Sequence, residues 1–334
     1  MAERRVGQLS LGEGTVVAAV GSNEVLERIA VLVDWVPVEA LLHDLRSGPM
    51  GAPGYPSLVM FKALLLQRWY ALSDPALEEA LKDRLSFRRF IGVALSDPIP
   101  DHSTLWRFRE ALGGARSAAV FAQIGRQIEA SGFVLKQGTL IDASLVPAAV
   151  KPPPPPKADL PPDSDGRPAS KLVASVHDPD AAWTSKNGKR HFGYKLHVAM
   201  DQASRIIRRL AVTPANVNDT VIADELICGD EAMVYADKAY DTHARSARLA
   251  DMGIVNGIMR RPNKWQKLTG DEVARNEHLA KTRGAIEPLF SLFKNVYGFT
   301  RVRYRGLRRN AAAFTLAAIA MNLKRWARCQ PAEA

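Results

Sequence analysis

The stretch Glu277–Asn295, EHLAKTRGAIEPLFSLFKN, is the part of the chain around which the rest is interpreted. Its apolar residues recur at helical spacing and predict a helix with one buried side, formed by Leu279, Ile286, Leu289, Phe290 and Phe293. Arg283, Glu287 and Lys294 lie four and seven residues apart. At about 100° per residue, all three fall within ~40° of one another on the helix surface. The stretch therefore predicts one carboxylate between two cations.

Positive charge is concentrated around this helix. The chain has a formal net charge of +10 and a pI of about 9.7. Between Arg260 and Arg309 there are 13 Lys and Arg residues against 4 Asp and Glu residues. Because the excess lies mostly in one stretch, it favours a polyanionic partner. An Arg283–Glu287 pair on a solvated helix face, worth a few tenths of a kcal/mol, is the alternative interpretation of the charged side.

Composition excludes several classes of protein. The 334 residues are 47% hydrophobic and 24% charged, as in soluble globular proteins of two domains. Cys228 and Cys329 give neither a disulfide framework nor a zinc spacing, which favours a cytoplasmic protein. No apolar run is long enough to span a membrane. The absence of GxSxG, Walker and GxGxxG motifs disfavours hydrolases, ATPases and enzymes with a nucleotide cofactor.

Residues 1–135 predict a helical N-terminal domain for DNA binding or dimerisation. Helices are expected over 57–72, 75–90 and 103–112. The last two are about a dozen residues apart, whereas a helix-turn-helix motif uses a turn of about 3–4 residues. DNA reading from the 103–112 helix and a plain helical bundle with a basic face both stay open. The DNA-reading candidates there are Ser103, Thr104, Arg107 and Arg109.

Residues 136–328 predict a second, α/β domain. Three strands, at 138–144, 191–201 and 205–213, precede an alternation of helices with strands at 232–237 and 254–259. This order predicts a mixed five-stranded sheet with helices on its faces. A Pro-rich insertion at about 147–190, which contains PPPPP, is expected to be a long loop. Trp183 within it either stacks on a base or anchors the loop.

Three carboxylates are placed where such a sheet collects its ligands. Asp142 ends the first strand, Asp237 ends the fourth, and Glu287 lies on the helix after the fifth. Three acids that meet need a compensating charge, and oxygen ligands suit Mg²⁺, with Mn²⁺ as a substitute. Two ions roughly 3.5–4 Å apart would activate the attacking oxygen and stabilise the leaving one in phosphoryl transfer. Turn-capping roles for Asp142 and Asp237 remain the structural alternative.

Other acids compete for these assignments. Asp201 is interpreted as a hairpin turn residue and Asp219 as a helix cap. Asp241 is close enough to Asp237 in the sequence to be confused with it. The seven histidines form no HxxxH or Cys/His cluster, which disfavours a zinc site.

These motifs together resemble a bacterial insertion-sequence transposase of the DDE type, most similar to the insertion-sequence-five group. Asp142 in TLIDAS resembles the first aspartate of that family, and Asp237 in YADKAYD the second. Arg283, Glu287 and Lys294 keep the spacing of the signature Tyr-x₂-Arg-x₃-Glu-x₆-Lys, but Ala280 stands at the tyrosine position. The resemblance implies an RNase H-like catalytic domain, cleavage at transposon ends and strand transfer. It implies Asp142, Asp237 and Glu287 as catalytic and metal-binding residues.

The basic residues around these acids predict the contacts with double-stranded DNA. Arg283 is expected either to contact phosphate or to pair with Glu287, and Trp265 to stack on an unpaired base or to pack. The expected DNA-binding residues are Arg283, Lys294, Trp265, Arg260, Arg261, Lys264, Arg301, Arg303, Arg305 and Arg107. The DNA is expected to be transposon terminal inverted repeats and target DNA, bound by a homodimer near the nucleoid. A hydrolysis-only nuclease of the same fold and a catalytically inactive DNA-binding regulator are the alternatives.

Overall fold

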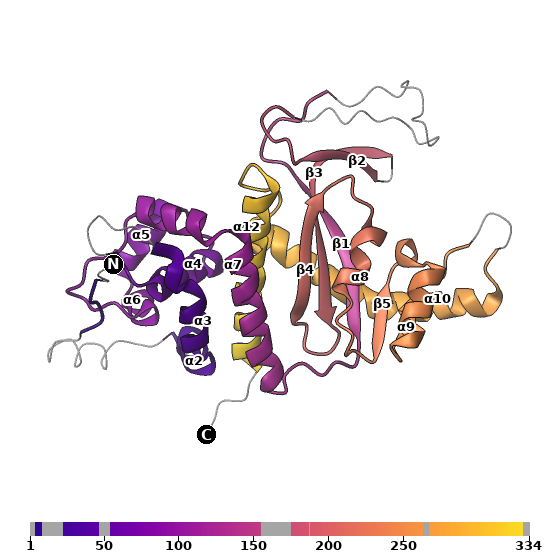
Figure 1. Cartoon of the computed structure of the whole chain (residues 1–334), viewed down its shortest axis with the longest axis horizontal. Helices are drawn as coiled ribbons and strands as arrows, with labels where there is room; N and C mark the ends of the chain where they lie inside the picture. The colour runs from indigo at the N-terminus through magenta and orange to yellow at the C-terminus, as the bar shows by residue number, and fades with distance from the viewer. Residues whose placement is uncertain are drawn as a thin grey trace. The chain divides into compact units, whose positions relative to one another are not determined.

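The computed structural model describes residues 4–8, 23–46, 54–154, 175–186, 188–262 and 267–329 (Figure 1). The chain divides into two compact units. The first consists of Met1–Phe133 with Thr315–Ala334, and the second of Val134–Phe314. In the described helices, none has the length and apolar character needed to cross a membrane.

The first unit is helical. Its elements are α2 (Glu24–Leu32), α3 (Trp35–Leu42), η1 (His43–Arg46), α4 (Ser57–Trp69), α5 (Asp74–Asp83), α6 (Leu85–Ile91) and α7 (His102–Ala130). Helix α4 is buried almost all round, as its nearly continuous apolar sequence predicts. Ser73 caps α5 by accepting a hydrogen bond from the Ala76 amide, and Asp101 caps α7 in the same way through Thr104. Local sequence signals thus set where these helices begin.

Helix α7 is interrupted at Gly113. That residue has φ 56° and ψ −173°, which lie outside the helical region and suit glycine. The interruption falls directly after the helix that the sequence predicts over 103–112. The connection from Ile91 to His102 is longer than a helix-turn-helix turn.

The second unit is built on a mixed sheet. Its strands are β1 (Thr139–Pro147), β2 (Ala182–Lys186), β3 (Lys189–Asp201), β4 (Ile207–Pro214), β5 (Met233–Ala236) and β6 (Val255–Ile258). Strand β3 pairs antiparallel with β1, β2 and β4, whereas β1, β5 and β6 are parallel. The order β4-β3-β1-β5-β6 agrees with the RNase H-like domain that the family resemblance implies. The predicted β-hairpin is confirmed as β3–β4.

Within the described residues, the sheet has six strands and not the predicted five. The additional strand, β2, lies within the insertion that was expected to be a loop. It pairs with the first residues of β3, from Ala182 with Gly193 to Lys186 with Lys189. The sequence contains a hairpin signal here that was missed: Asn187-Gly188 is a favoured two-residue hairpin loop. Residues 155–174 of the insertion lie outside the described part.

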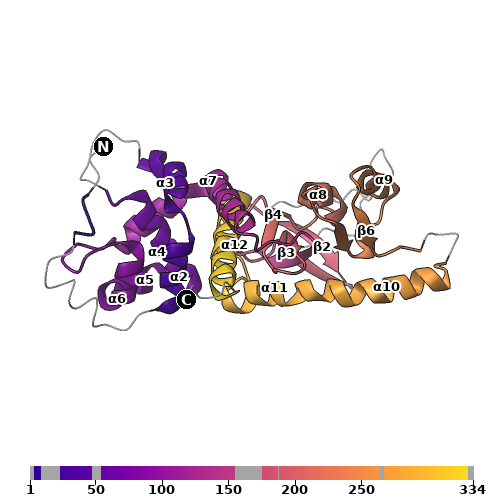
Figure 2. The ribbon, with the colours of Figure 1, turned by 90° about the horizontal axis from the view of Figure 1, so that it is seen from below.

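Helices cover both faces of the sheet (Figures 1 and 2). One face carries α8 (Asp219–Leu226) and α9 (His243–Asp251), whose Leu226 and Leu249 share a buried cluster with Ile141. The other carries α10 (Gly270–Arg283), η3 (Gly284–Ile286), α11 (Glu287–Ser291) and the π-helical η4 (Leu292–Val296). A short 3₁₀ turn, η2 (Lys238–Tyr240), follows β5, and α12 (Leu307–Cys329) ends the described chain.

The stretch Glu277–Asn295 is helical but not regular. Four residues of its predicted apolar side, Leu279, Ile286, Leu289 and Phe293, are under 9% exposed, whereas the fifth, Phe290, is only half-buried. Pro288 lacks an amide hydrogen and its ring clashes with the carbonyl of the residue four before it, which accounts for the 3₁₀ turn at Gly284–Ile286. The uniform 100° step therefore fails, and the polar residues do not form one regular side.

Candidate active site

Asp142 and Asp237 lie side by side on neighbouring strands. Strands β1 and β5 are parallel and pair from Thr139 with Val234. Continuing this register by three residues places Asp142 beside Asp237, which directly follows β5. Neighbouring strands are about 4.8 Å apart, and residues in register on parallel strands share a face. The fold thus brings the two aspartates together.

Asp142 lies inside β1 and not at its end as predicted. The strand continues to Pro147 because it pairs with β3 over its whole length, with Asp142 opposite Val198. What ends near Asp142 is the pairing with β5, after Leu140. Asp142 therefore still lies at the edge where β1 and β5 separate, although β1 itself continues.

Two partners hold the Asp142 carboxylate. The Ala143 amide donates to Oδ1 at 2.8 Å, and Arg283 Nη1 donates to Oδ2 at 3.0 Å. Burial raises the pKa of Asp142, and the negative charge of Asp237 acts in the same direction. The Ala143 amide and the charges of Arg283 and Lys186 act against this rise. Asp142 is thus a partly buried acid on which nearby cations and a second acid act in opposite directions.

Asp237 caps the turn η2. Its carboxylate accepts a hydrogen bond from the Lys238 amide at 2.6 Å, and its carbonyl accepts one from Tyr240. Tyr240 is fully buried, and its hydroxyl has no hydrogen-bond partner in the described structure. Burial raises the pKa of the Tyr240 hydroxyl, and the charges of Asp219, Asp142 and Asp237 add to the rise. A capping role and a place in an acidic site therefore coexist at Asp237.

Glu287 begins α11 and is exposed. Among the described residues, no hydrogen bond or ion pair joins it to Asp142 or Asp237. The three carboxylates do not converge to within 4.8 Å of one another; the one group of potential metal ligands at that spacing in the described chain is Cys228, Asp230 and Glu231. Like charges repel when no cation lies between them, so this spacing is expected without a metal ion.

Arg283 has a partner that the sequence did not suggest. Phosphate contact and pairing with Glu287 were the two expectations, but in this structure Arg283 pairs with Asp142. The side chains of Arg283 and Asp142 are 21% and 23% exposed, so solvent screens the pair only in part. Arg205 braces the same region, since its Nη1 donates to the Ala285 carbonyl at 3.1 Å. Helix α10 and the β3–β4 turn thus place a cation on the first aspartate.

The remaining predicted DNA contacts differ in accessibility. Val302 is 2% exposed while its alternating neighbours Arg301, Arg303 and Arg305 are exposed. Arg107 and Arg261 are exposed, whereas half-buried Arg260 donates to Asp241 at 3.3 Å. Lys264 and Trp265 lie outside the described residues.

The structure also shows the contacts of several other residues that the sequence singles out. Arg109 is held by Asp74 and Gln67, so it stabilises the helical unit. Trp183 packs against Phe192, with ring centroids 5.4 Å apart, as the anchoring interpretation predicts. Asp201 accepts hydrogen bonds from Ser204 and the Lys136 amide and is a turn residue as predicted. The cap of α8 is Asn218 and not Asp219, which pairs with Lys195 at 2.8 Å.

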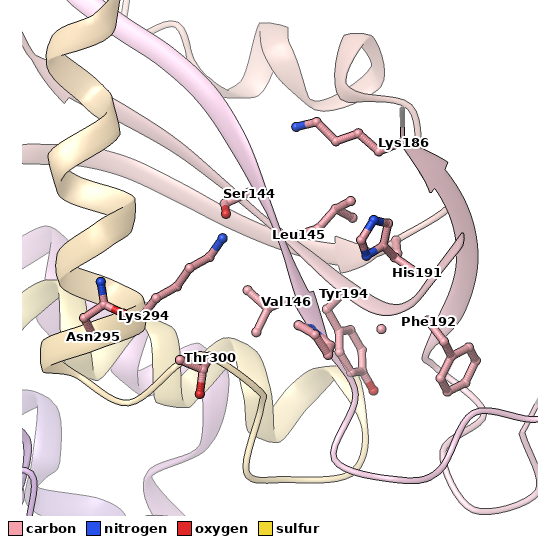
Figure 3. A pocket seen from close by; sticks show the side chains of 13 residues that line it. Ser144, Leu145, Val146, Lys186, His191, Phe192, Tyr194, Lys294, Asn295 and Thr300 are labelled. Carbon is pink, nitrogen blue, oxygen red and sulfur yellow. The ribbon is translucent and has the colours of Figure 1, made fainter. Parts of the chain in front are cut away.

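A cavity of about 420 Å³ lies along β1 from Ser144 to Pro147 (Figure 3). Its wall includes Ser144, Lys186, His191 and Lys294, of which Lys294 is a predicted DNA-binding residue. Sequence reasoning missed Lys186 because it treated the segment before residue 191 as a loop, and it missed His191 although that residue begins a predicted strand. The hairpin signal at Asn187-Gly188 would have placed both on paired strands.

Comparison with known protein families agrees with this geometry. Residues 135–323 match the family model described as "Transposase DDE domain", which covers more than half of the chain. The chain belongs to the DDE transposase family. Residues 16–111 match a second model, "Transposase domain (DUF772)", so both matches indicate an insertion-sequence transposase. As a DDE transposase it is a polynucleotidyl transferase, and the family generally depends on divalent metal ions.

One solved structure is also similar to this transposase. It is the cryo-EM structure of the piggyBac transposase synaptic complex with hairpin DNA, at 11% sequence identity and a TM-score of 0.43. The similarity covers 90% of this chain and 71% of that one.

Proposed function

We propose that this transposase, a member of the insertion-sequence-five group, cleaves double-stranded DNA at transposon ends and transfers the freed 3′-hydroxyl into target DNA. The observation that carries the proposal is the register of Asp142 and Asp237 on the parallel strands β1 and β5, inside the matched transposase domain. Two acids in register at a strand edge form a cation site beside the guanidinium group of Arg283. A membrane or nucleotide cofactor has no role in this account.

The donor set fits Mg²⁺, with Mn²⁺ as a substitute. Asp142, Asp237 and Glu287 would hold the ions, since carboxylate oxygens are the ligands that these hard cations prefer. A pair of such ions supplies activation of the attacking oxygen and stabilisation of the leaving oxygen. The ion pair between Arg283 and Asp142 supports the fit of this site to a metal ion, because Arg283 supplies positive charge where the metal ion would supply it.

The chain's own residues position the DNA. Arg283 is close enough to Asp142 to shift to a phosphate at the reacting centre, and its planar group suits two-point contact. The exposed Arg301, Arg303 and Arg305 hold the backbone without reading sequence. We assign DNA binding or dimerisation to residues 1–135 and catalysis to 136–328. Because two ends must meet, the acting form is a homodimer on DNA, at the nucleoid.

Joining of DNA strands tests this function. The transposase is incubated with Mg²⁺, labelled DNA that carries a transposon end, and an unlabelled target plasmid. The expected result is labelled DNA joined to the plasmid. Nicked ends without joined product would indicate a hydrolytic nuclease. Salt-sensitive DNA binding with no cutting would indicate an inactive regulator.

A further inference from the structure

The cavity that begins at Ser144 on β1 is basic, and the catalytic site proposed above leaves it without a ligand. Lys186 at the end of β2, His191 on β3 and Lys294 in η4 contribute side chains to its wall, and no lining residue is acidic. Figure 3 shows the amino groups of Lys186 and Lys294 directed toward the part of β1 around Ser144. Among the described residues, neither lysine has an ion-pair partner. Two unpaired cations beside one cavity indicate an anionic ligand.

The position of the cavity relates it to the reacting centre. Ser144 is two residues beyond Asp142 on β1, and alternate residues of a strand share a face. At about 3.3 Å per residue, the wall from Ser144 to Val146 begins ~7 Å from Asp142 and extends to ~13 Å. A DNA strand advances about 3.4 Å per phosphate along the duplex axis. For a duplex whose axis runs along β1, the cavity thus lies roughly two to four nucleotides from the cation site.

Size and lining indicate more than a bare ion. Small-molecule pockets measure roughly 300–1,000 Å³, and this cavity has about 420 Å³. Leu145 and Val146 give it an apolar wall, against which a deoxyribose can pack, while Ser144 offers a hydroxyl. The combination suits one nucleotide unit of a strand. The charge of Lys186 also acts on Asp142, which places that lysine near both sites.

We propose that Lys186, His191 and Lys294 form a seat for one nucleotide of the DNA strand, with its phosphate between the two lysines, two to four nucleotides from the phosphate that reacts. The proposal rests on the proposed function, and it adds β2 to the DNA-binding surface. Strand β2 and its hairpin with β3 then serve to bring Lys186 over β1. Non-specific backbone contact elsewhere does not require such a cavity.

Neutralising single phosphates tests the seat. End-containing DNA is prepared with one methylphosphonate at each position in turn along each strand around the cleavage point, and its affinity for the transposase is measured in Ca²⁺. We expect a loss of about tenfold for the parent protein at a phosphate two to four nucleotides from the cleaved one. Lys186→Ala should bind unmodified DNA about tenfold more weakly and lose the sensitivity at that phosphate. His191→Ala should reduce the same sensitivity.

Lys189→Ala is the matched control, because Lys189 is an exposed lysine on the same hairpin that does not line the cavity. It should keep the parent's sensitivity at every position. Equal sensitivity of the parent and Lys186→Ala at all phosphates, or the same change in Lys189→Ala, would overturn the proposal. If the transposase cuts and joins DNA but Lys186→Ala behaves as the parent protein does, the nucleotide seat is wrong and the proposed function stands. If Lys186→Ala changes the phosphate sensitivity but the transposase does not join DNA, the seat stands and the proposed function is wrong. Failure to bind DNA would overturn both proposals.

Discussion

Arg283 lies beside Asp142 where a metal cation would bind, with Nη1 at 3.0 Å from Oδ2. We expect Arg283→Gln to bind Mn²⁺ about tenfold more tightly in the absence of DNA, because a competing positive charge is removed. The same variant should cut DNA at least tenfold more slowly, since it loses a phosphate contact. Calorimetric titration with Mn²⁺ and single-turnover cutting measure the two effects. Lys281→Gln removes an exposed charge from the same helix and should change neither. Weaker Mn²⁺ binding by Arg283→Gln would refute this role.

His197 makes stability depend on pH. Its ring is fully buried, with Nε2 2.9 Å from Thr213 Oγ1 and Nδ1 4.0 Å from Asp219. Burial lowers the pKa of His197 to about 4; Asp219 opposes this shift and Lys195 adds to it. Between pH ~6.5 and ~4 the unfolded chain binds this proton and the folded chain does not. The free energy of unfolding should therefore fall by up to about 3 kcal/mol as the pH drops across that range.

Urea denaturation between pH 6.5 and 4.5 measures this dependence. In His197→Gln, which keeps a hydrogen-bonding group toward Thr213, the free energy of unfolding should vary less with pH than in the parent protein. An unchanged pH dependence would show that other groups carry the effect.

At the scale of elements, the close contact of β1 with β3 depends on Gly193. A Cβ there would lie 2.7 Å from the Ala148 amide nitrogen and would also clash with the Val146 carbonyl. Gly193→Ala should lower the free energy of unfolding by about 1–3 kcal/mol, as overpacking does. Thermal or urea unfolding measures the loss. Gly270→Ala, where nothing lies within 4 Å of the added atom, is the control and should be near neutral. A stable Gly193→Ala protein would contradict this packing.

The elements also show where sequence reasoning succeeds. Strongly periodic segments such as the buried side of Glu277–Asn295 and the β3–β4 hairpin follow from local pattern, because their apolar residues must face a core. Strand β2 was missed because a Pro-rich context outweighed the Asn187-Gly188 turn signal. The Arg283–Asp142 pair joins residues far apart in the chain, and no local pattern encodes it. The 3₁₀ turn before Pro288 likewise departs from the uniform helical geometry that the sequence had predicted.

At the scale of the whole molecule, the net charge of +10 makes DNA binding depend on salt. Each phosphate contact contributes about 0.9 to the slope of log K against log salt concentration for duplex DNA. Replacing Arg301, Arg303 and Arg305 together by Ala should reduce that slope by about 2–3. Fluorescence anisotropy at a series of NaCl concentrations measures it. Arg248→Ala, on α9, should leave the slope unchanged; an unchanged slope in the triple variant would exclude these arginines from the interface.

Catalysis by this transposase depends on three carboxylates that act as one cation site. The most direct test is single-turnover cutting and joining of end-containing DNA in Mg²⁺ by Asp142→Asn, Asp237→Asn and Glu287→Gln. Asp271→Asn, an exposed acid in the first turn of α10, is the control. We predict that each of the three variants loses at least 100-fold in rate while still binding DNA, and that the control matches the parent. Parental rates in any of the three would contradict the assignment of that carboxylate.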